Sequence, residues 1–215
     1  DTQDWQSALK NAMRQAPDCI LIGEIRDKET MQAAIAYSQT GHLCLATLHA
    51  NNSYHALNRI ISFFPPENRP ALFLDLSVAL RAIISQRLVK KPDGQRIPTS
   101  EIMLNTRHIS ELIERGEVQG IKDAMEQTLA PGSQTFEQDL FKLYSAGVIT
   151  IDEALANADS PTNLSWLINN SEFGSSNGKE DKKSDTALEF DSTNEGGTSF
   201  KEFTLSLADH DEENS

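Results

Sequence analysis

Residues 19–48 read CILIGEIRDKETMQAAIAYSQTGHLCLATL, and this stretch decides the fold. Its opening run, residues 19–22, is short and uninterrupted, as expected for a strand buried on both faces of a parallel sheet. Residues 28–39 have the spacing of a helix, and residues 42–48 form a second apolar run of strand length. With a further helix expected at 53–63, the strand–helix–strand–helix order predicts an α/β fold, a parallel sheet flanked by helices.

The segments on either side of this stretch are predicted to be mostly helical. A helix is expected at 4–15, and after two prolines a long amphipathic helix is expected at 67–86. Residues 89–102 read as a hairpin whose turn contains Pro-Asp-Gly-Gln. Shorter helices, which together read as a small bundle, are expected at 106–115, 118–129, 135–145 and 151–157.

Three regions follow from these patterns. Residues 1–104 are expected to be part of an α/β core, residues 105–169 a helical region, and residues 170–215 a disordered acidic tail. Twelve acidic and four basic residues give positions 171–215 a net charge of −8, out of −13 for the whole chain. Serine, glycine, asparagine and charged residues dominate there, and they cannot bury enough apolar surface to offset the loss of chain entropy.

Composition also excludes several classes of function. A net charge of −13 without a basic stripe argues against binding nucleic acid through its phosphates. The chain has no apolar run of the ~18–20 residues that a membrane-spanning helix requires, so no transmembrane segment is expected. The two cysteines, Cys19 and Cys44, form no CxxC pair and are expected to be reduced core residues.

The first candidate functional residue is Glu24, which follows the strand expected at 19–22. Ligands of parallel sheets bind at the carboxyl ends of the strands, so its carboxylate is expected at the mouth of a site. There it can hold Mg²⁺, directly or through water, or orient the water that attacks a γ-phosphate. Gly23 is expected to allow a tight turn and to leave room for a nucleotide. A structural ion pair of Glu24 is the alternative.

Two histidines bracket the second predicted strand. His42 enters it at the amino end and His49 leaves it at the carboxyl end, so a metal site shared by the two is not expected. His49 and Thr47 are expected at the same sheet edge as Glu24, where an imidazole can hydrogen-bond a phosphate and report its presence. A structural histidine is the alternative interpretation.

These motifs carry a resemblance to a known family. GEIRD at 23–27 and TGHLCLATLHAN at 40–51 resemble the Walker B and His boxes of secretion and pilus ATPases. The similarity continues through LNRIISFFPPENRP at 57–70 and QTFEQDLFKLYSAGVITIDEALANADS at 134–160. Over residues 1–168 the sequence resembles the PilT/PilU family of type IV pilus retraction ATPases, and in detail its PilU branch more than its PilT branch.

The resemblance implies a RecA-like P-loop ATPase domain that uses ATP and Mg²⁺ and assembles as a homo-hexamer. It implies an ATP-hydrolysing motor for pilus retraction and twitching motility, in the cytoplasm and peripheral to the inner membrane. The implied partners are a PilT-like ATPase ring, to which this subunit is an accessory, and the inner-membrane platform protein of the pilus.

By position, Glu24 matches the catalytic Walker B glutamate of the family, and His42 and His49 match its two His-box histidines. Arg26 and Asp27 complete the Walker B signature, with Gly23, and are expected to brace the site. The resemblance assigns His42, His49 and Arg59 to sensing of nucleotide or phosphate, and Thr47 joins them by its expected place at the same sheet edge as Glu24. For Arg59, contact with a neighbouring subunit or a surface ion pair is equally expected.

Departures from the family leave other functions open. Residues 1–215 contain no G-x-x-x-x-G-K-[ST] sequence. The phosphate-binding loop, Walker A, is therefore expected upstream of residue 1, and these residues alone are expected to be inactive.

Residues 107–114 read RHISELIE, where PilT carries AIRNLIRE, which favours the accessory role. The alternatives are a non-hydrolysing adaptor on a partner ring, or a pilus assembly or type II secretion ATPase. The latter commonly carry a four-cysteine zinc insertion that two cysteines cannot build.

Overall fold

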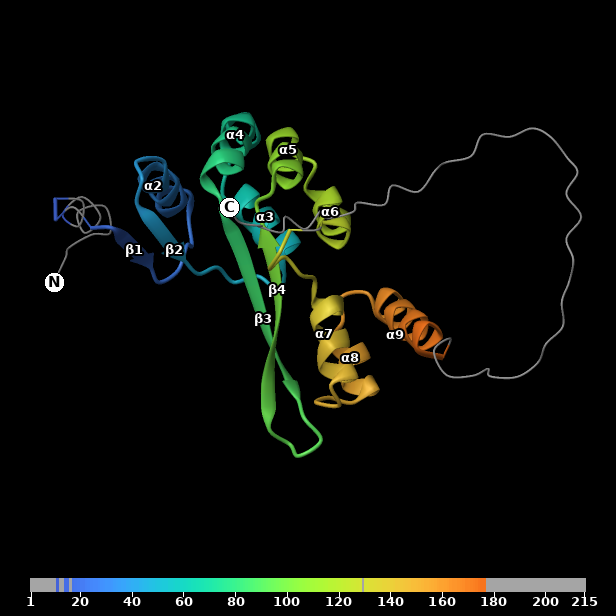
Figure 1. Cartoon of the computed structure of the whole chain (residues 1–215). Coiled ribbons are helices and arrows are strands. Elements are labelled where there is room, and N and C mark those ends of the chain that lie inside the picture. Colours follow the sequence, from blue (N-terminus) through green and yellow to red (C-terminus); the bar gives the residue numbers. More distant parts are fainter. Residues whose placement is uncertain (1–10, 12–13, 16, 129, 177–215) are drawn as a thin grey trace, which may run out of the picture. The chain divides into compact units, whose positions relative to one another are not determined.

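Two parallel strands, β1 (Cys19–Ile22) and β2 (Leu43–Ala46), are joined by helix α2 (Lys28–Gln39) (Figure 1). The strands pair in register from Cys19 opposite Leu43 to Ile22 opposite Ala46. The predicted parallel sheet with a crossover helix is therefore confirmed. The computed structural model describes residues 11, 14–15, 17–128 and 130–176, with the backbone alone for 171–176. Most of the helix predicted at 4–15, and the tail from residue 177, lie outside these residues.

The β1–β2 sheet has one buried and one exposed face. Ile20 and Ile22 are 7% and 0% exposed and join the core beside α2. On the opposite face Leu21, Leu43 and Leu45 are 72%, 55% and 49% exposed. The prediction of strands buried on both faces is thus wrong for the described part of the chain, because no described element covers this second face.

The same exposed face corrects the assignment of the cysteines. Cys19 lies on it and is exposed, whereas Cys44 on the other face is half-buried. Both are free, but only Cys44 packs against the core, so the prediction of a core residue is wrong for Cys19. Burial raises the pKa of the Cys44 thiol, which favours its neutral form.

After β2 the chain forms α3 (Ser53–Ser62), the short 3-10 helix η1 (Pro66–Asn68) and α4 (Arg69–Ala79). The prediction of one helix over 67–86 is wrong beyond Ala79, because Leu80 is extended and β3 (Ala82–Lys90) begins shortly after. The apolar residues near the end of that stretch fit both a helical and a strand period. These residues form a strand because β3 pairs with β4 (Arg96–Leu104) along its full length. The hairpin is therefore longer than predicted.

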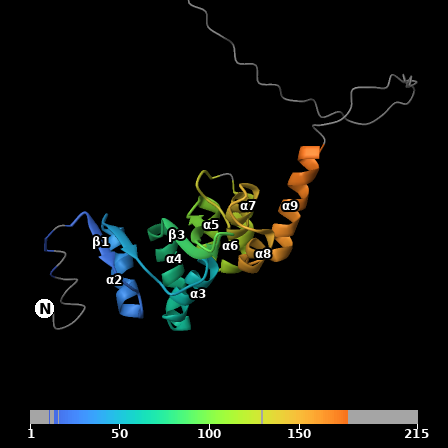
Figure 2. The same ribbon diagram turned by 90° about the horizontal axis from the view of Figure 1, so that it is seen from below.

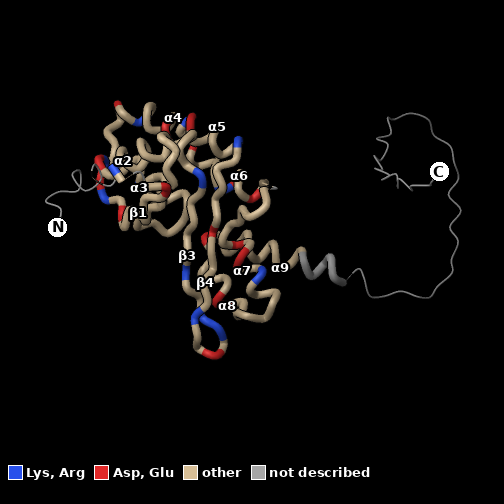
Figure 3. Tube along the Cα trace, turned by 60° about the vertical axis from the view of Figure 1, so that its left-hand side comes forward, with Lys and Arg blue, Asp and Glu red and all other residues tan. Residues whose placement is uncertain are grey.

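The hairpin is antiparallel, and lysine and arginine gather where its two strands meet (Figure 3). Asp93 organises this turn by accepting hydrogen bonds from the Gln95 amide at 2.9 Å and from Lys91 Nζ at 3.1 Å. Gly94 adopts a φ of 84°, as a turn glycine can without strain. The predicted turn at 92–95 is confirmed.

Helices complete two hydrophobic clusters. The first gathers residues of β1, α2, α3 and α4 with α5 (Arg107–Arg115), the 3-10 helix η2 (Val118–Gly120) and α6 (Ile121–Gln127). The second gathers α7 (Phe136–Ser145), α8 (Ile151–Asn157) and α9 (Pro161–Ser176) around Phe136 and Leu140, both fully buried (Figure 2). The helices predicted at 106–115, 135–145 and 151–157 are confirmed, whereas the helix expected at 118–129 is shorter and begins as a 3-10 turn.

Helix α9 corrects the boundary expected for the tail. It runs to Ser176, so residues 170–176 are helical where disorder was predicted. The signals for its start were present in the sequence, because Ser160 accepts from the Asn163 amide and Pro161 fits the first helical position. Leu164 and Ile168, four residues apart, are buried in the second cluster. Among the described helices we find none with the length and hydropathy needed to cross a membrane.

Gly116 ends α5 with a φ of 73°, and a Cβ at this position would lie 2.7 Å from Cε2 of Phe73. We expect Gly116→Ala to lower the free energy of unfolding by more than Gly94→Ala does. Both substitutions place an alanine in a left-handed backbone conformation, which costs about 1–2 kcal/mol. A Cβ on Gly94, however, meets nothing within 4 Å. The clash with Phe73 should add about 1 kcal/mol or more. Urea unfolding of both variants measures the difference, and equal losses would contradict the contact.

Candidate active site

The loops that follow β1 and β2 lie at one edge of the sheet because the strands are parallel. Their backbones remain paired beyond the strands, with Thr47 N–H donating to the Ile22 carbonyl at 3.3 Å and Ile25 N–H donating to the Thr47 carbonyl at 3.0 Å. The Thr47 hydroxyl also donates to the Gly23 carbonyl. These contacts fix the backbone on either side of Glu24 relative to the loop that carries His49.

Glu24 is the centre of the resulting cluster. Its Oε1 lies 3.0 Å from His49 Nε2, and its Oε2 accepts from Arg26 Nε at 2.6 Å. The Glu24 side chain is 22% exposed, whereas those of Arg26 and His49 are 77% and 87% exposed. The predicted proximity of Glu24 and His49 is therefore confirmed, and both lie where a ligand can reach them.

The surroundings of Glu24 favour its charged form. The hydrogen bond from Arg26 holds the pKa of the Glu24 carboxyl below its ordinary value, against the opposing effect of partial burial. Electrostatic interactions with Arg26, His49 and Arg59 lower the same pKa further. Glu24 is consequently an anion at neutral pH, able to accept a proton or a hydrogen bond from water, or to attract a cation.

Asp27 has a structural task beside the site. It is the N-cap of α2, and its Oδ1 accepts from the Thr30 amide at 2.8 Å. Hydrogen bonds from the Thr30 side chain and amide lower the pKa of Asp27. Through these contacts Asp27 braces the loop that carries Glu24.

The structure does not support the tight turn that the sequence predicted at Gly23. Its φ is not in the left-handed region, so the turn does not depend on the backbone freedom of glycine. A Cβ added there would meet nothing within 4 Å, which leaves open space next to Glu24. The expectation of a turn that requires glycine is wrong, whereas the role of Gly23 in making room for a nucleotide stays a prediction.

The other two predicted sensors lie apart from the Glu24–His49 contact. His42 occupies the turn between α2 and β2, where its Nδ1 lies 3.0 Å from Thr40 Oγ1 and 3.2 Å from the Tyr37 carbonyl oxygen. This turn is at the opposite end of β2 from His49, so the structure does not bring the two histidines together. Arg59 lies in the last turn of α3, with its guanidinium 5.2 Å from the centre of the Phe63 ring. Its charge nevertheless acts on Glu24.

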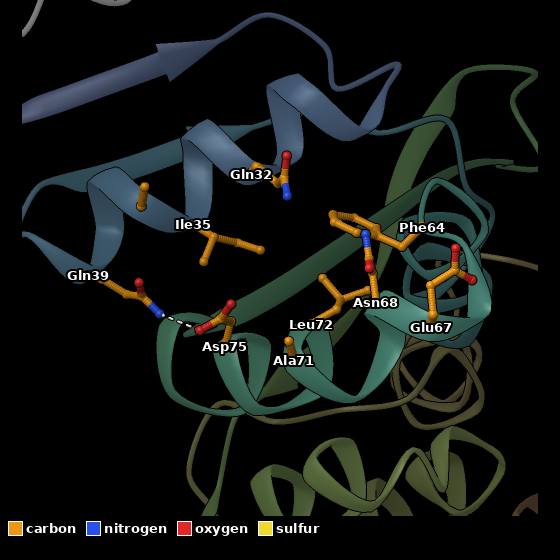
Figure 4. Close-up of a pocket in the computed structure, with 10 residues that line it drawn as sticks. Gln32, Ile35, Gln39, Phe64, Glu67, Asn68, Ala71, Leu72 and Asp75 are labelled. Atoms are coloured by element: carbon orange, nitrogen blue, oxygen red, sulfur yellow. Dashed lines mark hydrogen bonds between the residues drawn. The ribbon is translucent and has the colours of Figure 1, made fainter.

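A groove of about 340 Å³ lies elsewhere, between α2 and the segment from Phe64 to α4 (Figure 4). Ile35, Leu72 and Phe64 line it, and Gln39 Nε2 donates to Asp75 Oδ1 at 3.0 Å across one end. None of the residues predicted to act on a nucleotide lines this groove. The candidate chemistry lies instead at the strand ends.

The fit to a metal ion is limited. Within the described ranges no group of three or more His, Cys, Asp or Glu side chains is placed to hold a metal. Mg²⁺ does not need such a group, because it commonly binds one or two carboxylates together with waters and substrate phosphates. Glu24 is ionised and partly exposed, so it fits this mode of binding, directly or through water.

Sequence reasoning missed the residues that fix the chain beyond His49. Asn52 is the N-cap of α3, and its Oδ1 accepts from the His55 amide at 2.8 Å. The Asn-Ser pair before a helical pattern was a usable signal for this cap. Arg87 and Asp159, which also hold this segment, are distant from it in sequence and carry no such signal.

Comparison with known proteins shows which families this chain is similar to. Residues 2–96 match the family model described as "Type II/IV secretion system protein". The chain is 50% identical over 169 residues to the type IV pilus ATPase PilU of Pseudomonas aeruginosa, covering 78% of this chain and 44% of PilU. It is 36% identical over 164 residues to the retraction ATPase PilT of the same organism, covering 76% of this chain and 48% of PilT.

A solved structure shares the fold. The crystal structure of the pilus retraction motor PilT with bound ADP superposes with a TM-score of 0.68 at 36% identity, covering 76% of this chain and 46% of that one. The chain thus spans somewhat less than half the length of the relatives it matches. The fold and the family match first define a class, the proteins of type II and type IV secretion systems. Within this class, the chain belongs to the PilT/PilU family.

The ion pair at Glu24 can be tested by titration. We expect Arg26→Gln to raise the pKa of Glu24 toward its ordinary value, and His49→Ala to raise it less, because Arg26 contributes most to the shift. Since the folded-state pKa is lowered, the stabilisation from this pair is present at neutral pH and is lost as pH falls through that pKa. NMR titration of the Glu24 carboxyl carbon measures both effects. A larger response to His49→Ala would contradict this order.

Proposed function

We propose that this chain is part of an ATP-hydrolysing motor for type IV pilus retraction and twitching motility, a PilU-like accessory to a PilT-like ring. The observation that carries the proposal is the contact of an ionised Glu24 with His49 at the carboxyl ends of two parallel strands. In such sheets this edge receives the ligand. The match to PilU along most of this chain supports the pilus machine as the place where the site acts.

In the proposed mechanism, Glu24 orients a water molecule toward the γ-phosphorus of ATP. The water oxygen forms the new bond to phosphorus, the bond to the bridging oxygen breaks, and ADP leaves with that oxygen. The water gives a proton to the Glu24 carboxylate, which later returns it to solvent or phosphate. Bound Mg²⁺ would neutralise charge on the phosphate oxygens, and Glu24 is the residue that would hold it, directly or through water.

His49 has the role of a phosphate sensor in this proposal. Its imidazole is 3.0 Å from Glu24 Oε1, and it is exposed enough to turn toward an incoming phosphate oxygen. This exchange of partners would free one Glu24 oxygen for water only when a phosphate is present. Thr47, through its hydroxyl bond to Gly23, would keep the two loops at a fixed separation.

We further propose that the phosphate-binding loop belongs to a segment outside these 215 residues. The exposed apolar face of β1 and β2, with Leu21, Leu43 and Leu45, is a surface that such a segment would cover. On β3, Ile84 and Leu88 are 70% and 52% exposed and offer a second apolar surface. Surfaces of this kind are costly to leave in water, at about 25 cal/mol per Å² of apolar area.

Assembly and location are part of the same proposal. We expect a cytoplasmic homo-hexamer that works beside a PilT-like ATPase and contacts the inner-membrane platform protein of the pilus. Residues 1–104 would then serve as a partial ATPase core. The helical region that starts at residue 105 would extend through α9 to Ser176, and the acidic residues after it would form the tail.

A second candidate is an adaptor that docks on a partner ATPase ring without hydrolysing ATP. The stretch RHISELIE at 107–114, where PilT carries AIRNLIRE, favours this adaptor, and a G-x-x-x-x-G-K-[ST] motif would count against it. The full-length gene distinguishes the two candidates, because such a motif roughly seventy residues before Glu24 supports the motor, as expected for a phosphate loop that precedes its Walker B strand.

In the intact protein, we expect Glu24→Gln to lower kcat for ATP hydrolysis by about 10²–10⁴-fold while nucleotide affinity stays nearly unchanged. The substitution removes the negative charge and keeps the shape of the side chain. Glu29→Gln, in the first turn of α2 and exposed, is the matched control and should keep wild-type turnover. Steady-state ATPase rates with a binding titration decide the question. Wild-type turnover in Glu24→Gln would reject Glu24 as the residue that positions the water.

A further inference from the structure

Three consecutive residues that follow the His49 loop are each held by a charged side chain from a distant part of the chain. We name this set of contacts the 51–53 clamp. One contact is to a backbone carbonyl, one to a side-chain amide and one to a backbone amide. They are Arg87 Nη2 to the Asn51 carbonyl at 3.2 Å, Asn52 Nδ2 to Asp159 Oδ2 at 2.7 Å, and Ser53 N–H to Glu101 Oε1 at 2.7 Å.

Arg87 is the fixed centre of the clamp. Its guanidinium lies 3.9 Å above the ring of Phe136, which is fully buried, and it donates to the Asn157 carbonyl at 2.7 Å and to Asp159 Oδ1 at 2.5 Å. The planar, five-donor guanidinium is suited to several simultaneous contacts. Arg87 on β3 therefore ties the turn between α8 and α9 to the segment behind His49.

Asp159 is held as an anion in this position. Its partial burial would raise its pKa, but hydrogen bonds from Asn52 and Arg87, together with the charges of Arg87 and Lys122, outweigh that effect and lower it. Glu101 is 3% exposed, and burial raises its pKa, although the hydrogen bond from the Ser53 amide acts in the opposite direction. Removal of one partner would leave a charged or polar group poorly compensated.

The clamp is close enough to the site to fix its geometry. His49 is 87% exposed, so side-chain packing restrains it little and its backbone must place the imidazole. Asn52 follows three residues later, and each residue spans at most about 3.6 Å of chain. Asn52 also starts α3 by accepting from the His55 amide at 2.8 Å. A shift of Asn52 relative to Asp159 would therefore displace both the helix start and the loop.

We propose that Asp159 and Arg87 are positioning residues for His49, acting through Asn51 and Asn52. The clamp holds the loop so that the imidazole reaches Glu24 and, in turn, the terminal phosphate. The turn between α8 and α9, although remote in sequence, thereby controls the geometry of the hydrolytic edge. The expected effect on turnover rests on the proposed function. The restraint of the His49 loop by Asp159 does not depend on that function.

The test uses an exchange of the two polar partners in the intact protein. Asn52→Asp keeps an N-cap residue but sets two carboxylates against each other, and Asp159→Asn removes the charge that Arg87 contacts. We expect each change to lower kcat about 10-fold or more, as removal of a charged hydrogen bond does, with KM for ATP nearly unchanged. The double variant restores an amide–carboxylate pair in reversed roles but leaves Arg87 facing a neutral side chain at position 159, so it should recover part of the lost kcat.

Asp93→Asn is the matched control, because Asp93 also pairs with a basic side chain but lies in the hairpin turn. It should keep wild-type kcat. Amide hydrogen exchange without nucleotide gives a readout that is independent of hydrolysis. Each single variant should speed exchange at residues 50–56, and the double variant should slow it again.

The two readouts separate the two proposals. If Glu24→Gln retains turnover, the proposed function fails, and hydrogen exchange still decides whether the clamp fixes the loop. Unchanged exchange at residues 50–56 in both single variants would overturn the clamp. The positioning role of the clamp would also be overturned if Glu24→Gln abolished turnover while the single clamp variants showed faster exchange and wild-type kcat. The loop would then move without any effect on the site.

Discussion

The parallel pairing of β1 and β2 is the constraint on which the rest of the site depends. Parallel strands end at the same edge, so residues that follow them in sequence meet although a helix of 12 residues separates the strands. Glu24 and His49 meet for this reason, and backbone hydrogen bonds between Ile25, Thr47 and Ile22 extend the pairing to the loops themselves. An antiparallel arrangement would place these two side chains at opposite edges.

Local patterns predicted the elements that carry this constraint. The apolar runs around Ile20 and Cys44 gave both strands, and the position of Glu24 just beyond the first strand led directly to its place at the edge. The prediction failed where two periods fit the same residues, as in β3, whose pairing with a strand further along the chain decided its form. It also failed for the exposure of Cys19 and Leu21, which depends on what packs against the sheet.

The 51–53 clamp could not be predicted from the sequence, for a different reason. Asn52 and Asp159 are 107 positions apart, and Arg87 and Asp159 are 72 apart, so no spacing rule joins them. Each residue alone reads as an ordinary surface polar group. Only the folded arrangement of β3, the α8–α9 turn and the start of α3 shows that they share one network. The clamp also gives the helices after β4 a physical connection to the candidate hydrolytic edge, which separate domains would lack.

The central claim is that the edge formed by Glu24 and His49 receives the terminal phosphate of a nucleotide. The most direct measurement is a structure of the intact protein with a non-hydrolysable ATP analogue and Mg²⁺. We expect the terminal phosphate beside both residues, with the His49 imidazole turned from Glu24 toward a phosphate oxygen. An analogue bound at the opposite end of β2, near His42, or in the groove between α2 and α4, would contradict the account.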